Sequence, residues 1–201
     1  MSTQVRKATT LFLADDDQSV RHTLKDFFAG CPEYRVVGEA CDGAAAVEQC
    51  RKLKPNVALL DIQMPVLDGI GAARLLLAEG LAHCVVILTA FSDRMYIQGA
   101  LDAGAFGYLT KPFEPNKILP TLELCIHQSR QHHLVKKERQ SLNRRLSGYA
   151  MVDRAKLKLM ENDGMTEAEA YQYIKELSRR KAMSMETISK YLIAGAEGPH
   201  E

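Results

Sequence analysis

Short apolar runs alternate with amphipathic stretches along the first part of the chain. Each run has the length of a buried strand, and the runs lie at residues 11–14, 34–37, 57–60, 84–88 and 106–109. The stretches between them predict helices near residues 18–29, 43–53, 67–79 and 92–102. Because parallel strands need crossover connections, this alternation predicts a doubly wound α/β fold with a parallel, five-stranded sheet.

No strand pattern follows Pro115. Residues 116–147 predict one long helix, with Pro120 near its first turn, where proline is tolerated. The second half of this helix carries a seam with alternating spacings of four and three residues, at Val135, Arg139, Leu142, Leu146 and Tyr149. Because the seam is short and Arg139 interrupts it, the pattern fits a coiled coil and a solvated connecting helix about equally.

Three short amphipathic helices are predicted in the last part of the chain. The first spans residues 151–162, the second begins with a capping box formed by Thr166 and Glu169, and the third begins near Ser184. The apolar face of the second helix is expected to hold Ala170, Tyr171, Ile174 and Leu177. We therefore expect a domain at residues 1–120, a helical linker at 121–148, a three-helix domain at 149–196 and a tail at 197–201.

The net charge of +1 conceals an asymmetry between the two halves of the chain. Residues 1–115 hold 11 Lys and Arg against 14 Asp and Glu, a net charge of −3, whereas residues 116–201 hold 15 against 11, a net charge of +4. Within the second half, residues 130–158 hold nine basic residues against two acidic ones. The second half alone is therefore expected to bind a polyanion.

The composition excludes several classes of protein. A hydrophobic fraction of 46% and a charged fraction of 25% exclude disordered and low-complexity chains. No apolar run approaches the roughly 18 residues of a membrane span, and the N-terminus lacks the apolar stretch of a signal peptide, so we expect a cytoplasmic protein with no membrane partner. The five cysteines form no CxxC pair and are expected to be buried free thiols: Cys31, Cys41, Cys50, Cys84 and Cys125.

Polar side chains follow four of the predicted strands at their carboxyl ends. The first strand is followed by Asp15, Asp16 and Asp17, the third by Asp61, the fourth by Thr89 and the fifth by Lys111. In an open parallel sheet these ends form the crevice in which ligands bind. Clustered carboxylates repel one another unless a hard cation lies between them, and Mg²⁺ is the usual choice for oxygen ligands. A lysine and a hydroxyl beside the cation suit an anionic group, so the set predicts phosphoryl transfer to an aspartate.

The segments LFLADDDQSVR, ALLDIQMPVLDG, VILTAF and AGAFGYLTKPF resemble the receiver domain of two-component response regulators, over residues 10–125. The resemblance implies a flavodoxin-like fold, a sensor histidine kinase as partner and Asp61 as the phosphoacceptor. It also implies that Asp16, Asp61 and the backbone carbonyl of Gln63 bind Mg²⁺, with Asp15 helping through water.

The same resemblance assigns roles to three residues around the phosphoacceptor. Thr89 would bond the phosphoryl group and shift inward on activation, Lys111 would pair with the phosphoryl oxygens, and Tyr108 would be the switch aromatic. The Lys111-Pro112 peptide bond is expected to be cis. We expect slow autodephosphorylation of the acyl phosphate, and a regulator rather than an enzyme.

The segment after the predicted linker resembles the ANTAR domain, an RNA-binding module of transcription antiterminators. The features that carry the resemblance are Arg154-Ala155-Lys156, Leu159-Met160, Gly164-Met165-Thr166-Glu167, Ala170-Tyr171, Ile174, Met185 and Ile188. The resemblance implies that phosphorylation promotes a homodimer, whose paired output domains bind hairpin RNA in a nascent transcript and prevent a terminator from forming. The chain departs from the family pattern at Leu157, Lys158, Ser178, Arg179 and Ala182.

Basic residues at helical spacing independently indicate a polyanion partner. Arg154 and Lys158 share one helix face, and so do Lys175 and Arg179. The expected RNA-binding residues are Arg154, Lys156, Lys158, Lys175, Arg179, Arg180, Lys181 and Tyr173. The cations would bind phosphates with salt-dependent affinity. For Tyr173, stacking on an unpaired base and plain surface exposure are equally compatible with its position.

Three alternatives lead to different tests. A DNA-binding response regulator would need a recognition helix, whereas the predicted third helix holds one basic residue, Lys190. A phosphatase with an aspartyl nucleophile would need a substrate-binding cap, for which the sequence shows no segment. The third alternative is a C-terminal region that only docks protein partners.

Overall fold

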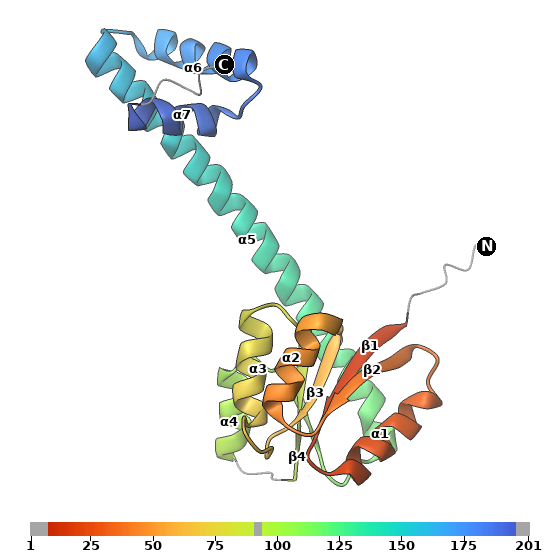
Figure 1. Ribbon diagram of the computed structural model, residues 1–201. Helices are drawn as coiled ribbons and strands as arrows, with labels where there is room; N and C mark the ends of the chain where they lie inside the picture. Colours follow the sequence, from red (N-terminus) through yellow and green to blue (C-terminus); the bar gives the residue numbers. More distant parts are fainter. Residues whose placement is uncertain (1–7, 91–93, 196–201) are drawn as a thin grey trace, which may run out of the picture. The chain divides into compact units, whose positions relative to one another are not determined.

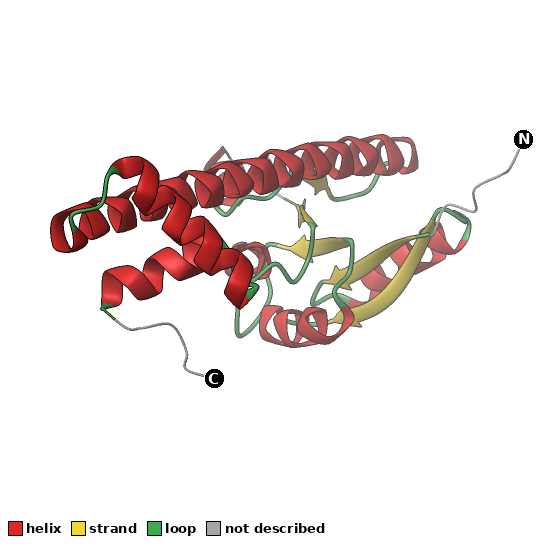
Figure 2. Cartoon of the chain, turned by 90° about the horizontal axis from the view of Figure 1, so that it is seen from above, coloured by secondary structure: helices red, strands yellow, loops and turns green. Residues whose placement is uncertain are grey.

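The computed structural model describes residues 8–90 and 94–195. The chain divides into two compact units, Met1–His133 and Leu134–Glu201. All strands lie in the first unit, and the described part of the second unit is helical (Figures 1 and 2). Among the described residues, no helix has both the length and the apolar character that a membrane crossing requires.

A parallel sheet with the strand order β2-β1-β3-β4-β5 forms the centre of the first unit (Figure 1). Its strands are β1 (Thr9–Ala14), β2 (Tyr34–Ala40), β3 (Val57–Asp61), β4 (Cys84–Thr89) and β5 (Gly107–Thr110). The five predicted runs form these five strands, and the predicted doubly wound α/β fold is confirmed. The strand order reverses between β1 and β3, where such sheets have their ligand crevice.

Helices cover both faces of the sheet, and each face has its own core. The helices are α1 (Gln18–Ala29), α2 (Gly43–Leu53), α3 (Gly69–Ala78), α4 (Arg94–Asp102) and the first part of α5 (Pro115–Asp163). Successive strand residues point to opposite faces. Leu59 accordingly packs in the cluster of α1 and α5, and Leu60 in the cluster of α2 and α3. Burying each of these leucines contributes about 2 kcal/mol, which explains why the strands are continuous apolar runs.

The helix α5 is longer than expected. It runs without a break through residues for which two helices were predicted, at 116–147 and 151–162. Gly148 lies where the break was expected, but glycine inside a helix costs only about 1 kcal/mol, and no proline follows it to stop the helix. Pro120 lies near the beginning of α5, as expected.

The second unit is a small helical domain. The C-terminal part of α5 packs with α6 (Glu167–Lys181) and α7 (Met185–Ala194). The buried apolar residues between the three helices are Ala155, Leu159, Ala170, Ile174 and Ile188. The predicted capping box of Thr166 and Glu169 is confirmed, and Ser184 caps α7. Good caps matter here because so small a core contributes little stability.

Two expectations about burial are wrong. Tyr171 is 43% exposed and lies outside the core, because one residue step on a helix turns it about 100° away from Ala170. All five cysteines are free, but Cys41 is exposed and Cys31 is partly exposed. Both lie at the ends of secondary-structure elements rather than in the layers that cover the sheet.

Candidate functional site

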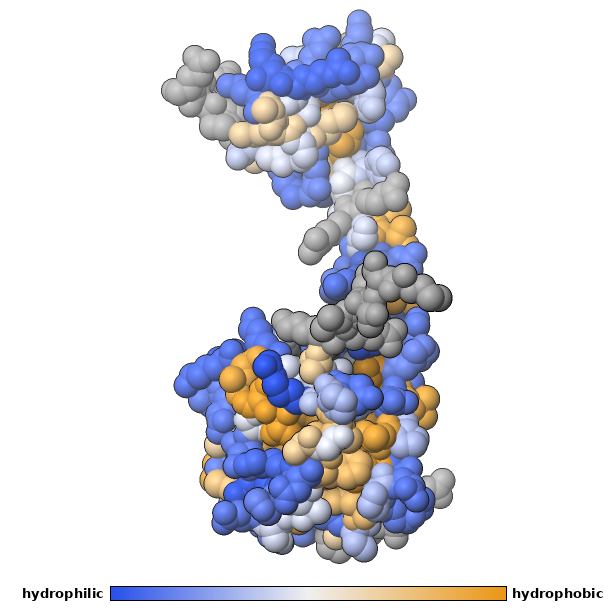
Figure 3. Space-filling view, turned by 90° about the vertical axis from the view of Figure 1, so that its right-hand side faces the viewer, coloured by the Kyte–Doolittle hydropathy of each residue, from blue (hydrophilic) through white to orange (hydrophobic). Residues whose placement is uncertain are grey.

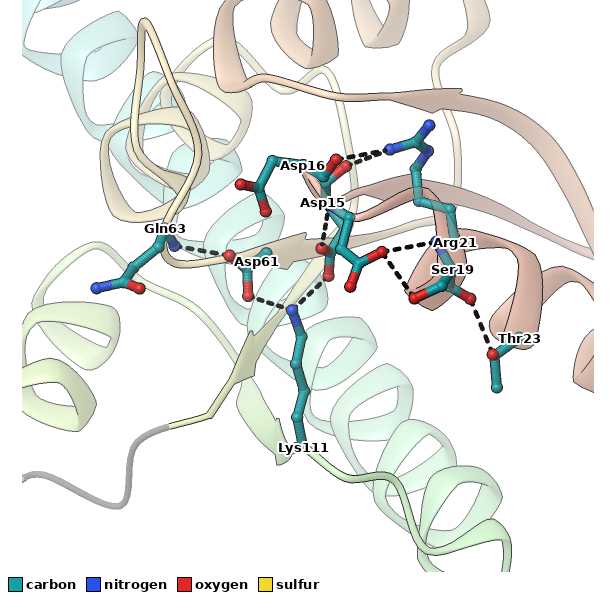
Figure 4. Close-up of polar contacts among 9 residues, drawn as sticks. Asp15, Asp16, Ser19, Arg21, Thr23, Asp61, Gln63 and Lys111 are labelled. Carbon is teal, nitrogen blue, oxygen red and sulfur yellow. Dashed lines mark hydrogen bonds and ion pairs between the residues drawn. The ribbon is translucent and has the colours of Figure 1, made fainter.

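Three strand ends bring acidic and basic side chains of the first unit together (Figure 4). Asp15 directly follows β1, Asp61 ends β3 and Lys111 directly follows β5. The parallel register pairs Ala14 with Leu60, so Asp15 and Asp61 come after paired positions on neighbouring strands. The structure therefore brings these predicted residues together at the carboxyl edge of the sheet.

The ammonium group of Lys111 bridges two carboxylates. Its Nζ lies 2.6 Å from Oδ2 of Asp15 and 2.6 Å from Oδ1 of Asp61. Burial raises the pKa of Asp15 above its usual value, although Lys111 acts against this. Burial acts to lower the pKa of Lys111, but the hydrogen bonds to Asp15 and Asp61 outweigh it and raise the pKa. Lys111 is therefore protonated at neutral pH and offsets part of the charge of the acidic cluster.

The acidic cluster offers a ligand set for a hard divalent cation. Asp15, Asp16 and Asp61 each contribute a carboxylate oxygen, and these oxygens lie within 4.8 Å of one another. Asp15 and Asp61 are 0% and 6% exposed, whereas Asp16 is open to solvent. Mg²⁺ prefers oxygen ligands and keeps several waters, so two buried carboxylates beside an exposed one fit it well.

The loop after β3 is built around Asp61. The backbone N–H of Gln63 donates to Oδ2 of Asp61 at 2.8 Å, which places the main chain of Gln63 at the acidic cluster. A Cβ at Gly69 would lie 1.9 Å from the carbonyl oxygen of Asp61, so only glycine fits there without a shift of the main chain. Asp68 caps α3 by accepting a hydrogen bond from the N–H of Gly71. These contacts hold the carboxylate of Asp61 in place.

The other residues predicted for this site lie on β4 and β5. Thr89 is 1% exposed at the end of β4, and its carbonyl accepts a hydrogen bond from the N–H of Lys111 at 2.7 Å. Tyr108 lies in β5 and is 42% exposed. The Lys111-Pro112 peptide bond is cis, as predicted.

Arg21 also belongs to the site, although we did not expect it from the sequence. One of its guanidinium nitrogens, NH1, donates to the carbonyl of Asp15 at 2.7 Å and to that of Asp16 at 3.4 Å (Figure 4). Its Nε lies 3.4 Å from Oε2 of Glu39 on β2. Arg21, which lies on α1, therefore links the acidic turn after β1 to Glu39 on β2. The sequence feature that could have indicated this role is an arginine one helical turn after Asp17.

The predicted RNA-binding residues of α5 differ in their contacts within the protein. Arg154 is exposed and forms no salt bridge within the described part of the chain. Lys156 lies 2.8 Å from Asp153 and 2.7 Å from Glu167, and these hydrogen bonds raise its pKa to about 12. Lys158 donates to the carbonyls of the last turn of α7, Leu192 at 3.1 Å and Ile193 at 2.8 Å.

The predicted cations of α6 lie in its C-terminal half. Arg179 and Arg180 are exposed, and Lys175 and Lys181 are partly exposed. Tyr173 is 41% exposed. The face of the second unit seen in Figure 3 is largely hydrophilic. Most of the predicted RNA-binding residues are therefore accessible, and Lys156 and Lys158 are bound to the partners named above.

A five-stranded parallel sheet with buried aspartates and a lysine at its carboxyl edge defines a receiver. The family model described as "Response regulator receiver domain" matches residues 11–123, and the ANTAR domain model matches residues 140–193. The chain belongs to the response regulators and has an ANTAR output domain. The receiver and ANTAR domains are those of a regulator rather than of a catalytic enzyme. Their combination supports a role as an RNA-binding antiterminator.

Individual relatives agree with this assignment. The transcriptional regulatory protein PdtaR of Mycobacterium tuberculosis is 34% identical over 91% of this chain and 88% of its own length. Among solved structures, the receiver domain of the response regulator NarL from Mycobacterium tuberculosis matches with a TM-score of 0.57 and 30% identity. This alignment covers 60% of this chain and 98% of that domain. The receiver of a diguanylate cyclase from Desulfovibrio desulfuricans also has a TM-score of 0.57, at 27% identity.

Proposed function

We propose that this protein is a phosphorylation-dependent antiterminator, in which phosphorylation of Asp61 by a sensor histidine kinase controls binding to hairpin RNA. The observation that carries the proposal is the pair of 2.6 Å contacts from Lys111 to Asp15 and Asp61 in a chain that ends in an ANTAR domain. The proposed domains are a receiver at residues 1–120, a helical linker at 121–148 and an RNA-binding domain at 149–196.

The geometry around Asp61 suits the transfer of a phosphoryl group. A carboxylate oxygen of Asp61 attacks the phosphorus in line, a P–O bond forms, and the P–N bond to the kinase histidine breaks. Lys111 then pairs with a phosphoryl oxygen instead of Asp61, and the hydroxyl of Thr89 bonds another. Mg²⁺ held by Asp16, Asp61, the carbonyl of Gln63 and, through water, Asp15 would neutralise charge on the phosphoryl oxygens. The resulting acyl phosphate hydrolyses slowly, which resets the switch.

The exposed surface of α5 supports the proposed homodimer. The residues of the predicted seam that are apolar are well exposed: Val135 63%, Leu142 51%, Leu146 65% and Tyr149 63%. Apolar surface is visible along this stretch of α5 in Figure 3. Together with Arg139, these residues are spaced alternately by four and three, which suits a partner helix of the same sequence, so a second copy would cover them. We propose that phosphorylation, through Tyr108 and its surroundings, favours this pairing.

The second unit would then bind RNA through phosphate contacts. Arg154, Lys175, Arg179, Arg180 and Lys181 supply cations on accessible surface. Lys156 and Lys158 reach a phosphate only if they release Glu167 and the end of α7, respectively. Contacts of this kind produce an affinity that falls with rising salt.

The replacement Asp61→Asn tests the phosphoacceptor. It keeps the size of the side chain but removes the nucleophile, so labelling by a radioactive phosphodonor should disappear. The matched control is Asp17→Asn, which changes an exposed aspartate that caps α1 outside the acidic cluster and should leave labelling intact. Persistent labelling of the Asp61 variant would contradict the assignment.

RNA and DNA are separated by a second experiment. The phosphorylated protein is offered hairpin RNA and duplex DNA of equal length in competition. Preferential binding of the hairpin supports the proposal, whereas preferential binding of the duplex would favour a DNA-binding regulator. Binding of neither would favour a region that docks proteins.

A further inference from the structure

The helix α6 carries two tyrosines that are exposed to nearly the same extent but lie on different faces. Tyr171 is 43% exposed and Tyr173 is 41% exposed. Two residue steps on a helix turn the side chain by roughly 200°, so the two rings point in nearly opposite directions around α6. Exposure therefore does not distinguish them as partners for RNA, but the charges beside each ring do.

Cations follow Tyr171 on its face of α6. Tyr171, Lys175 and Arg179 are spaced by four residues, so their side chains form one row along α6, with neighbours about 6 Å apart along the axis. Within the described part of the chain, neither cation of the row forms a salt bridge. The acidic residue one turn before Tyr171 is Glu167, and Lys156 lies 2.7 Å from it and 2.8 Å from Asp153, so these two carboxylates share one cation and the two cations of the row leave a net positive charge. The surroundings of Tyr171 are therefore positive on balance.

Two acidic residues flank Tyr173 on its side of α6, and Arg180 follows two turns after the ring. Glu169 lies one turn before Tyr173, and Glu176 lies one turn after it. Hydrogen bonds to Thr166 in the capping box lower the pKa of Glu169, so this carboxylate is charged at neutral pH. Negative charge one turn before and one turn after the ring disfavours the phosphates of a nucleotide whose base stacks there.

We propose that Tyr171, rather than Tyr173, is the stacking residue of the RNA interface, and that Lys175 and Arg179 bind the adjoining phosphates. An unpaired loop base offers a π-face to the ring of Tyr171, and the backbone of the strand then follows the row of cations. The occupant is single-stranded RNA in a hairpin loop. This inference rests on the proposed RNA-binding function and specifies its site.

The test uses the full-length protein with beryllofluoride and Mg²⁺. A hairpin is first selected with the wild-type protein from a library with a fixed stem and a randomised loop. Its loop is then labelled with a fluorescent adenine analogue that is quenched by stacking. The variants are Tyr171→Ala, Tyr171→Phe and, as the matched control of equal exposure, Tyr173→Ala. Because both tyrosines lie outside the core, thermal unfolding of all three should match that of the wild type.

Tyr171→Ala should weaken binding at least about fivefold and abolish the quenching, as expected for the loss of one stacked base. Tyr171→Phe keeps the ring and should restore both, and Tyr173→Ala should leave both unchanged. A larger loss for Tyr173→Ala, or undiminished quenching in Tyr171→Ala, would overturn the inference while leaving the proposed function intact. If the library yields no hairpin that the wild-type protein binds, the proposed function itself fails.

Discussion

Lys111 in the receiver is proposed to bind the phosphoryl group, and Arg154 in the output domain is proposed to bind an RNA phosphate. The surroundings of these two cations differ. Lys111 lies 2.6 Å from each of two buried carboxylates, whereas Arg154 is exposed and lacks a salt bridge among the described residues. The receiver therefore holds its charges in a fixed arrangement, in which Lys111 offsets part of the acidic charge, as a site for one phosphoryl group requires. The output domain leaves cations on its surface, where a flexible polyanion can reach them.

The receiver side of this comparison depends on the tight fit between Gly69 and Asp61. In Gly69→Ala, the new Cβ would lie 1.9 Å from the carbonyl oxygen of Asp61, so the loop must move and the acidic cluster with it. We expect a loss of about 3 kcal/mol in the free energy of unfolding and a large loss of phosphorylation. Urea denaturation and labelling by a phosphodonor measure the two effects.

Gly30→Ala is the control for this replacement. Its φ of −79° suits alanine, and a Cβ there would lie 3.5 Å from the nearest heavy atom. Its stability and phosphorylation should stay close to those of the wild type. Equal behaviour of the two variants would show that the fit at Gly69 does not position Asp61.

Replacing Lys158 tests whether every basic residue of the output domain is available to RNA. Its ammonium donates to the carbonyls of Leu192 and Ile193, where a positive charge also favours the helix end. Lys158→Met should therefore lower the free energy of unfolding of the output domain by about 2 kcal/mol. Calorimetry of the full chain should show the loss in the transition of that domain.

The same variant should leave the salt dependence of RNA binding unchanged. A residue bound to a phosphate would instead reduce the slope of log affinity against log salt by about one, as we expect for Arg154→Ala. An unchanged stability together with a reduced slope in Lys158→Met would show that Lys158 binds RNA.

The smallest expected effect concerns pH and the capping box of α6. The hydrogen bonds to Thr166 lower the pKa of Glu169 below its usual 4.5. Its contribution to stability is therefore present above pH 4.5 and is lost as the pH falls through the lowered pKa. Thermal unfolding of Glu169→Gln should respond less to pH in this window than the wild type. Identical pH profiles would mean that the carboxylate of the capping box contributes nothing.

The features of the fold and of the site that could be predicted are those that depend on the local pattern of apolar and polar residues. Buried parallel strands are continuous apolar runs, so the positions that follow them, including Asp15, Asp61 and Lys111, could be placed at one edge of the sheet. The role of Arg21 was missed because its partners are main-chain carbonyls, and its spacing from Asp17 alone does not show what it binds. Tyr171 was assigned to the core because its position at the border of an apolar face does not show which side the neighbouring helices cover.

The continuity of α5 and the capping contact of Lys158 were missed for a related reason. The pattern was divided into helices at 116–147 and 151–162, but Gly148 between them costs a helix only about 1 kcal/mol, so α5 continues through it. Lys158 was counted with the other surface cations because its spacing from Arg154 is helical, whereas its partners lie on α7, far away in the sequence. Such contacts depend on tertiary packing and become visible only in the structure.

The most direct test of the central claim is the affinity of the full-length protein for its selected hairpin RNA, measured with and without beryllofluoride and Mg²⁺. Sedimentation in the same samples reports the oligomeric state. The account predicts that the phosphoryl mimic produces a dimer and strengthens RNA binding, and that Asp61→Asn shows neither change. Equal affinity with and without the mimic in the wild-type protein would contradict phosphorylation control of the RNA-binding domain.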